Sequence, residues 1–210
     1  MGDFDVIAVR YRGEGVRDVA VPEGTVALGD GAFAGHSEIE TVTLPEGLTS
    51  IGEACFRGCS SLRSVTLPST LAEIGKSAFL GCSGLEEVDI PAGVEVIPES
   101  AFNMCSRLRR VTGGSGLYGI GPSAFSSCSC LVECEPLGTA VDVGKLAFSG
   151  CTSLAEVVLP EYMMYLGHAA FRCCTALRRV TIPRETQAME GDPYVLCSDD
   201  LVFLKRPDAD

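Results

Sequence analysis

The chain has 210 residues, of which 46% are hydrophobic and 21% charged, and its formal net charge is −12. This composition is typical of a folded chain rather than a disordered one, and the length is sufficient to bury a core. The negative charge makes nucleic acid a poor partner, because phosphate binding requires clustered Lys and Arg. The longest uncharged stretch, residues 111–132, is rich in Gly and Ser, so we expect no membrane span.

Residues 1–21 are predicted to form a capping hairpin that leads into the first rung of a stack. Apolar and polar residues alternate over residues 4–11, Gly-Glu-Gly at residues 13–15 offers a turn, and Val19 and Val21 lie on the inner side of the second strand. The segment lacks an apolar run after a basic start, so we do not expect it to act as a signal peptide.

Residues 22–183 are predicted to form seven repeats of 23 residues, each centred on a phenylalanine. Strict self-similarity of this kind is typical of a solenoid, because one repeat cannot bury its apolar side alone and must stack on its neighbours. Equivalent residues of successive repeats then form columns along the stack. The phenylalanine column consists of Phe33, Phe56, Phe79, Phe102, Phe125, Phe148 and Phe171.

The spacing of apolar residues predicts the local structure of one repeat. Alternation over residues 62–67 predicts a short strand with one buried face, which Pro68 ends because proline cannot donate to a ladder. Residues 71–74 predict a second short extended segment. The spacing of three to four residues over residues 78–85 predicts about one and a half turns of helix.

Residues 184–210 are predicted to form a degenerate capping repeat and a tail, continuous with the same domain. Met189, Tyr194 and Cys197 still fall on the isoleucine, phenylalanine and cysteine columns. A last strand at residues 201–204 would seal the core at this end.

The run Leu62-x-x-Val65-x-Leu67-Pro68 resembles the core of a leucine-rich repeat. The longer pattern resembles the BspA-like class of these repeats over residues 19–183, and it runs through Ile74, Gly75, Ala78, Phe79, Cys82, Leu85, Val88, Ile90 and Pro91. The resemblance implies an α/β repeat fold, a right-handed solenoid with a parallel sheet on one face and short helices or turns elsewhere. It also implies a protein-binding role such as adhesion or host contact, and it implies no catalytic residue.

Cysteine occurs 11 times, and seven of these residues follow a repeat aromatic by three positions. We interpret the column as small buried thiols that fill space beneath the next repeat, which fits a reducing compartment such as the cytoplasm. Disulfides between neighbours are the alternative, and the family resemblance favours the cell surface or secretion. Cys128, Cys130 and Cys134 lack the paired spacing of structural zinc sites, so we expect no metal site.

Neither histidine belongs to a recognisable catalytic arrangement. His36 falls on the cysteine column and His168 on a column of exposed turn residues, and no motif places a nucleophile beside either of them. The glycine-rich residues 113–121 lack the Lys-Ser/Thr ending of a phosphate loop. The sequence therefore predicts a protein without catalytic activity and without a cofactor.

Two columns, seven and eight residues after the phenylalanine, are expected to lie on the exposed side of the first strand. Their charges alternate, which permits ion pairs between neighbouring strands. This polar sheet face is either a solvated, self-neutralised surface or a docking surface. Its candidate residues are Arg63, Glu86, Glu87, Arg109, Arg110, Glu133, Glu156, Arg178 and Arg179.

The column seven residues before the phenylalanine becomes apolar toward the C-terminus. We call Tyr118, Val141, Met164 and the flanking Tyr162 and Tyr165 the apolar patch. Exposed apolar neighbours tend to mark contact surfaces, so these five residues are the candidate partner-binding residues. The leading hypothesis is a module that recognises a protein partner. The alternative is a structural repeat protein whose patch mediates self-association, as in a homodimer. In a third interpretation, the patch only covers the degenerate fifth and sixth repeats.

Overall fold

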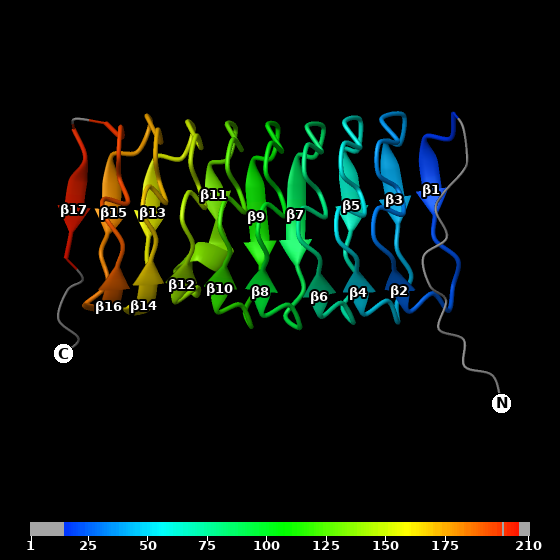
Figure 1. Ribbon diagram of the computed structural model, residues 1–210, viewed down its shortest axis with the longest axis horizontal. Coiled ribbons are helices and arrows are strands. Elements are labelled where there is room, and N and C mark those ends of the chain that lie inside the picture. Colours follow the sequence, from blue (N-terminus) through cyan, green and yellow to red (C-terminus); the bar gives the residue numbers. More distant parts are fainter. Residues whose placement is uncertain (1–14, 199, 206–210) are drawn as a thin grey trace.

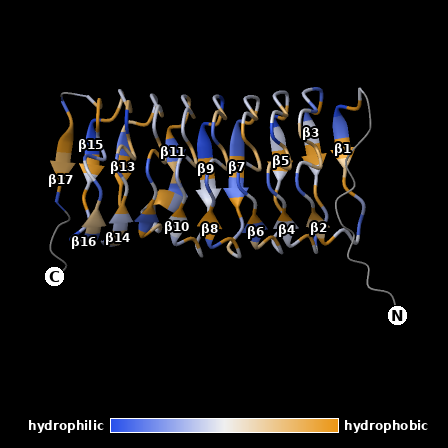
Figure 2. Ribbon diagram, viewed as in Figure 1, coloured by the Kyte–Doolittle hydropathy of each residue, from blue (hydrophilic) through white to orange (hydrophobic). Residues whose placement is uncertain are grey.

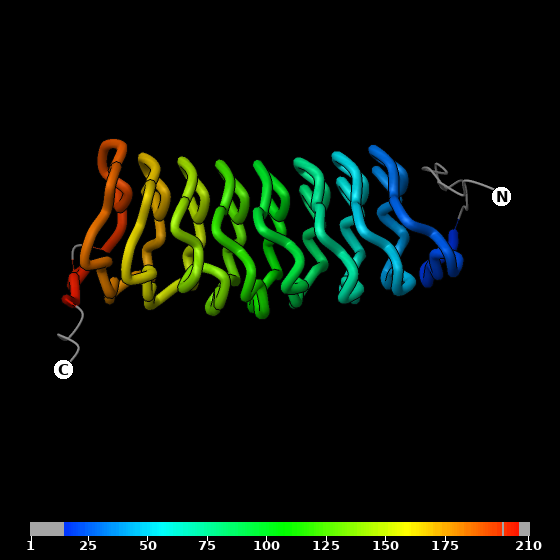
Figure 3. The backbone as a smooth tube through the Cα atoms, turned by 90° about the horizontal axis from the view of Figure 1, so that it is seen from below, coloured from blue at the N-terminus to red at the C-terminus, as the bar shows by residue number. Residues whose placement is uncertain are grey.

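The computed structural model describes residues 15–198 and 200–205, so most of the expected N-terminal hairpin lies outside the described residues. The chain coils into a stack of similar turns with β1 and β17 at opposite ends (Figures 1 and 3). Two rows of short strands run along the stack, the odd-numbered strands in one row and the even-numbered strands in the other. The fold is a parallel-sheet solenoid.

The odd row contains β1 (Asp18–Ala20), β3 (Thr41–Thr43), β5 (Ser64–Thr66), β7 (Glu87–Ile90), β9 (Arg110–Gly113), β11 (Glu133–Cys134), β13 (Glu156–Val158), β15 (Arg179–Thr181) and β17 (Val202–Leu204). The even row contains β2 (Ala27–Leu28), β4 (Ser50–Ile51), β6 (Glu73–Ile74), β8 (Val96–Ile97), β10 (Gly119–Ile120), β12 (Asp142–Val143), β14 (Tyr162–Leu166) and β16 (Glu185–Met189). Paired strands are parallel and join equivalent residues, as in the pairing of Val42 with Val65. The sheet expected on one face is thus accompanied by a second row, built from the second extended segment of each repeat.

The helical turns expected over residues 78–85 do not form. Ser77 and Gly81 have φ angles of 55° and 74°, which a right-handed helix does not accommodate. The N–H group of Phe79 donates to the carbonyl of Ala101 in the next repeat, whereas that of Cys82 closes a local turn on Phe79. Backbone donors thus alternate between the neighbouring rung and the local turn. Within the described residues, the one helix is a 3₁₀ segment, η1 (Glu135–Gly138).

The interior consists of the phenylalanine, leucine and cysteine columns, as the repeat pattern predicts. The phenylalanine rings from Phe33 to Phe171 stack face to face, with neighbouring centroids 5.0–5.4 Å apart. The stack continues to Tyr194, 5.5 Å from Phe171. Six of the seven phenylalanines have no exposed surface. Stacked rings bury a large apolar area and bind each repeat to the next.

The cysteine column has a polar function that the sequence analysis missed. Each thiol donates to the carbonyl oxygen of the repeat aromatic 26 residues earlier, at 2.9–3.2 Å, and the donors are Cys59, Cys82, Cys105, Cys128, Cys151, Cys174 and Cys197. All 11 cysteines are free thiols in the structure. Cysteine suits the position because it is small and apolar, yet it still donates a weak hydrogen bond to a buried carbonyl.

Candidate functional site

On the polar sheet face, the column eight residues after the phenylalanine is internally neutralised. Arg110 contacts Glu87 and Glu133 on the two neighbouring strands, at 3.3 and 3.0 Å. Arg179 pairs with Glu156 in the same manner, and Arg178 donates to the carbonyl oxygen of Thr175 at 2.8 Å. Exposed pairs of this kind contribute only about 0.2–1 kcal/mol each. Their main effect is to remove charge that would otherwise be available to a partner.

The column seven residues after the phenylalanine is different in its middle repeats, where the charges are not paired. Arg63 and Arg109 are both exposed, and neither forms an ion pair with any described residue. Glu86 stands between them in the column and likewise forms no ion pair within the described part of the chain. The structure therefore leaves two guanidinium groups and one carboxylate of the predicted face open to solvent.

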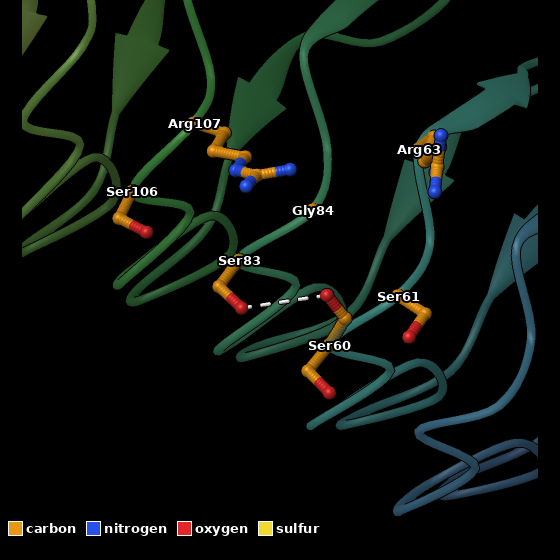
Figure 4. Close-up of a pocket in the computed structure, with 7 residues that line it drawn as sticks. All are labelled: Ser60, Ser61, Arg63, Ser83, Gly84, Ser106 and Arg107. Atoms are coloured by element: carbon orange, nitrogen blue, oxygen red, sulfur yellow. Dashed lines mark hydrogen bonds between the residues drawn. The ribbon is translucent and has the colours of Figure 1, made fainter.

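A shallow polar groove lies beside the unpaired Arg63 (Figure 4). It has a volume of about 350 Å³ and is lined by Ser60, Ser61, Arg63, Ser83, Gly84, Ser106 and Arg107. The Arg107 side chain lies over Gly84, with Arg63 on the far side of the groove. Sequence reasoning missed this groove because Arg107 belongs to a column that holds Ser61 and Gly84 in the preceding repeats.

The apolar patch lies on the even row of strands. Backbone hydrogen bonds of 2.9 Å from Val141 to Tyr118 and 2.7 Å from Met164 to Val141 place the three residues on successive rungs. Tyr118 and Met164 are 52% and 56% exposed, and Val141 is half-buried. Alternation along β14 puts Tyr162, which is 56% exposed, on the same side as Met164. The structure thus brings four of the five predicted residues together on one exposed surface.

Tyr165, the fifth patch residue, has a partner that the sequence did not reveal. Its hydroxyl donates to the Glu190 carboxylate beyond β16, and this hydrogen bond raises the pKa of Tyr165 to about 12, with burial and the charge of Glu190 contributing less. The neighbouring Asp142 is partly buried, which raises the pKa of its carboxyl. Tyr165 therefore fixes the C-terminal border of the patch and presents less free surface than Tyr118 or Met164.

Metal-binding clusters and membrane-spanning helices are absent from residues 15–198 and 200–205. No three His, Cys, Asp or Glu side chains in these residues gather closely enough to hold a metal ion. No helix there has the length and apolar character needed to cross a membrane. His36 lies 2.9 Å from the Glu38 carboxylate, an interaction that lowers the pKa of Glu38. The apolar patch and the polar groove form the candidate functional site.

Comparison with known proteins identifies the repeat family. A family model for the BspA type leucine-rich repeat region matches the chain in six copies, over residues 11–132 and 120–199. Curated proteins gave no match. The chain is similar to the crystal structure of a leucine-rich repeat protein from T. pallidum, with 32% identity, a TM-score of 0.75 and coverage of 81% of this chain and 82% of that one. A leucine-rich repeat protein from Bacteroides ovatus shares the fold, with 23% identity, a TM-score of 0.50 and coverage of 92% and 67%.

Proposed function

Because the chain belongs to the family of BspA-type leucine-rich repeat proteins, we propose that it is a non-catalytic module that binds a protein partner through the apolar patch. Proteins built from leucine-rich repeats commonly serve in protein interactions. The observation that carries the proposal is the row of Tyr118, Val141 and Met164 on successive, directly hydrogen-bonded rungs. The partner belongs to adhesion or host contact, the role that the family resemblance implies.

The composition of the patch suits a binding surface. Burying an exposed apolar side chain of this size contributes about 1.5–3 kcal/mol, so three or four of them provide the central energy of an interface. Tyr118 and Tyr162 combine a large apolar area with a hydroxyl that can bond at the rim. The solenoid holds these residues on short paired strands, which lowers the entropy lost on binding.

The unpaired arginines offer a second contact region on the odd row. Arg63, Arg107 and Arg109 stand in a molecule with a net charge of −12, so the attraction for acidic groups is local. Such groups would steer a partner and set its orientation more than they would raise its affinity. The neutralised column of the same face, with Arg110, is a solvated surface in this proposal.

The test replaces Val141 and Met164 with glutamate. The matched control is Thr49→Glu with Ala72→Glu, which adds the same charges to the same column where it is exposed but carries no large apolar side chain. To identify the partner, a chain with a photo-crosslinking residue in place of Tyr118 is incubated with proteins that host cells secrete or display. Mass spectrometry then identifies the crosslinked protein. We expect the patch variant to bind that partner at least about 100-fold more weakly, because two carboxylates would be desolvated against an apolar surface. The control should change affinity by less than about threefold.

Three outcomes would contradict the proposal. Equal losses of affinity in both double variants would show a general effect of charge. Crosslinks confined to a second copy of the chain, together with a dimer that the patch variant abolishes, would support the structural alternative. Unfolding of the patch variant would show that Val141 and Met164 are interior residues, whereas Ala140 and Met163 are the buried neighbours in the structure.

A further inference from the structure

The C-terminal end of the solenoid exposes an apolar edge strand. β17 is the outermost strand of its sheet and pairs only with β15 within the described residues. Its three side chains are all apolar, and Val202, Phe203 and Leu204 are 52%, 50% and 41% exposed. Figure 2 shows β17 as apolar along its whole length. Phe203 covers Tyr194 edge-on at 5.1 Å, but its outer surface remains open to solvent.

An edge strand of this kind is a template for further strand pairing. Natural proteins usually block such edges with an inward charge, a proline or a bulge. β17 is short, but residues 202–204 contain no charge, proline or bulge, and the hollow beside the strand, about 470 Å³, is lined mainly by apolar groups that include Ile182, Met189 and Tyr194. Met189 at the end of β16 is 55% exposed as well. Both rows of strands therefore end on one apolar surface.

The sequence of this edge is complementary to itself. It reads Asp200-Leu-Val-Phe-Leu-Lys205, with an exposed acid at one end, an exposed base at the other and four apolar residues between them. Neither Asp200 nor Lys205 forms an ion pair with a described residue. In an antiparallel pair with Val202 opposite Phe203 of a second copy, Asp200 lies opposite Lys205 of that copy. The two-fold axis repeats this ion pair.

We propose that β17 pairs with β17 of a second copy, joining the odd rows of two chains tail to tail. A two-fold interface of this kind is self-complementary and closed, so it gives a dimer and not a fibre. β16 is the last strand of the even row and lies one rung behind β17, so the two copies of β16 do not pair in this dimer. The dimer covers the apolar edge of β17 and leaves the apolar patch free for a partner.

The test is a charge swap measured by sedimentation equilibrium of the purified chain. Asp200→Lys alone places lysine opposite lysine twice, and Lys205→Asp alone places aspartate opposite aspartate twice. We expect each single variant to weaken the dimer by about 10-fold, because like charges opposite one another destabilise a strand pair. The double variant Asp200→Lys with Lys205→Asp restores opposite charges and should return the dimer affinity to within about threefold of the original.

Folding is monitored by thermal melting of each variant as a dilute monomer, where exposed charges should have little effect. Phe203→Asp, placed at the centre of the pair, should abolish the dimer. A chain that stays monomeric up to about 100 μM would overturn the proposal. A double variant that is weaker than both single variants would overturn the antiparallel register. Loss of the dimer in the Val141→Glu and Met164→Glu variant, with β17 variants unaffected, would assign self-association to the patch instead.

Discussion

Phe102 and Tyr194 occupy the same column, one in the middle of the solenoid and one at its C-terminal end, and their surroundings differ. Phe102 has no exposed surface and lies between Phe79 and Phe125, at 5.2 and 5.4 Å. Tyr194 stacks on Phe171 but meets only the edge of a half-exposed Phe203 on its other side. Each rung of a solenoid contacts only its neighbours, so the same column position gives different stability in the two regions.

The largest expected effect concerns the pH dependence of stability, which the buried cysteines of the interior control. Burial raises the pKa of Cys55 and Cys59 to about 12, and it raises those of Cys82, Cys105, Cys128, Cys151 and Cys174 as well. An unfolded thiol has a pKa near 8.5. The native state therefore keeps its protons when the unfolded state loses them, and the resulting stability is present below pH ~8.5 and lost as pH rises toward 12.

Seven such thiols would reduce the free energy of unfolding by on the order of 10 kcal/mol between pH 8.5 and 10. We therefore expect cooperative unfolding in this range, measured by circular dichroism and urea titration. The matched control is Cys82→Ser with Cys105→Ser, because serine donates to the same carbonyls but does not titrate there. The free energy of unfolding of this variant should fall less steeply with pH, by about 3 kcal/mol per pH unit. A free energy of unfolding that stays constant from pH 8 to 10 would show that the thiols are not held neutral in a closed core.

The next largest difference is between Phe102→Ala and Tyr194→Ala. Removing a fully enclosed ring should cost about 3–5 kcal/mol, because the two neighbouring rings cannot close the cavity. Tyr194 is half-buried and its neighbour Phe203 can move, so the loss there should be below about 2 kcal/mol. Urea unfolding of both variants measures the contrast. Equal losses would show that the C-terminal end is as well packed as the middle.

The interior could be predicted from the sequence because every column is repeated. A side chain that recurs at one position in each repeat meets its own copies, so Phe79 and Cys82 could be assigned to the core without any tertiary information. The exposed row of Tyr118 and Met164 followed from strand alternation in the same way. Tyr165 could not be placed, since its hydrogen bond to Glu190 depends on how the irregular last repeat folds back.

The helical turns were predicted wrongly because spacing alone does not report the sign of φ. Periods of three to four residues occur in a helix and also in this chain of tight turns, where two residues of each repeat adopt positive φ. A signal was present in the sequence. Glycine recurs two residues after the phenylalanine at Gly35, Gly58, Gly81 and Gly150, and all four have φ between 74° and 81°. Glycine at a helical position would be unfavourable, so its recurrence indicates left-handed backbone.

The smallest predicted effect uses that column to distinguish the two local structures. Met104 stands where other repeats have glycine, with a φ of 62° and a side chain that is 58% exposed. In a helix, Met104→Gly would destabilise the protein by about 0.5–1 kcal/mol. At a left-handed position the same substitution removes the steric strain of the Cβ atom, which is worth about 1–2 kcal/mol. This gain is partly offset, because glycine loses more backbone entropy than methionine on folding. The hydrogen bond from the N–H group of residue 104 to the carbonyl oxygen of Ser126 is retained, because both groups belong to the backbone.

We therefore expect Met104→Gly to raise the free energy of unfolding by about 0.5–1 kcal/mol, measured by urea unfolding. The reverse change, Gly81→Met, should lower it by a similar amount. A destabilised Met104→Gly variant would favour the helical interpretation.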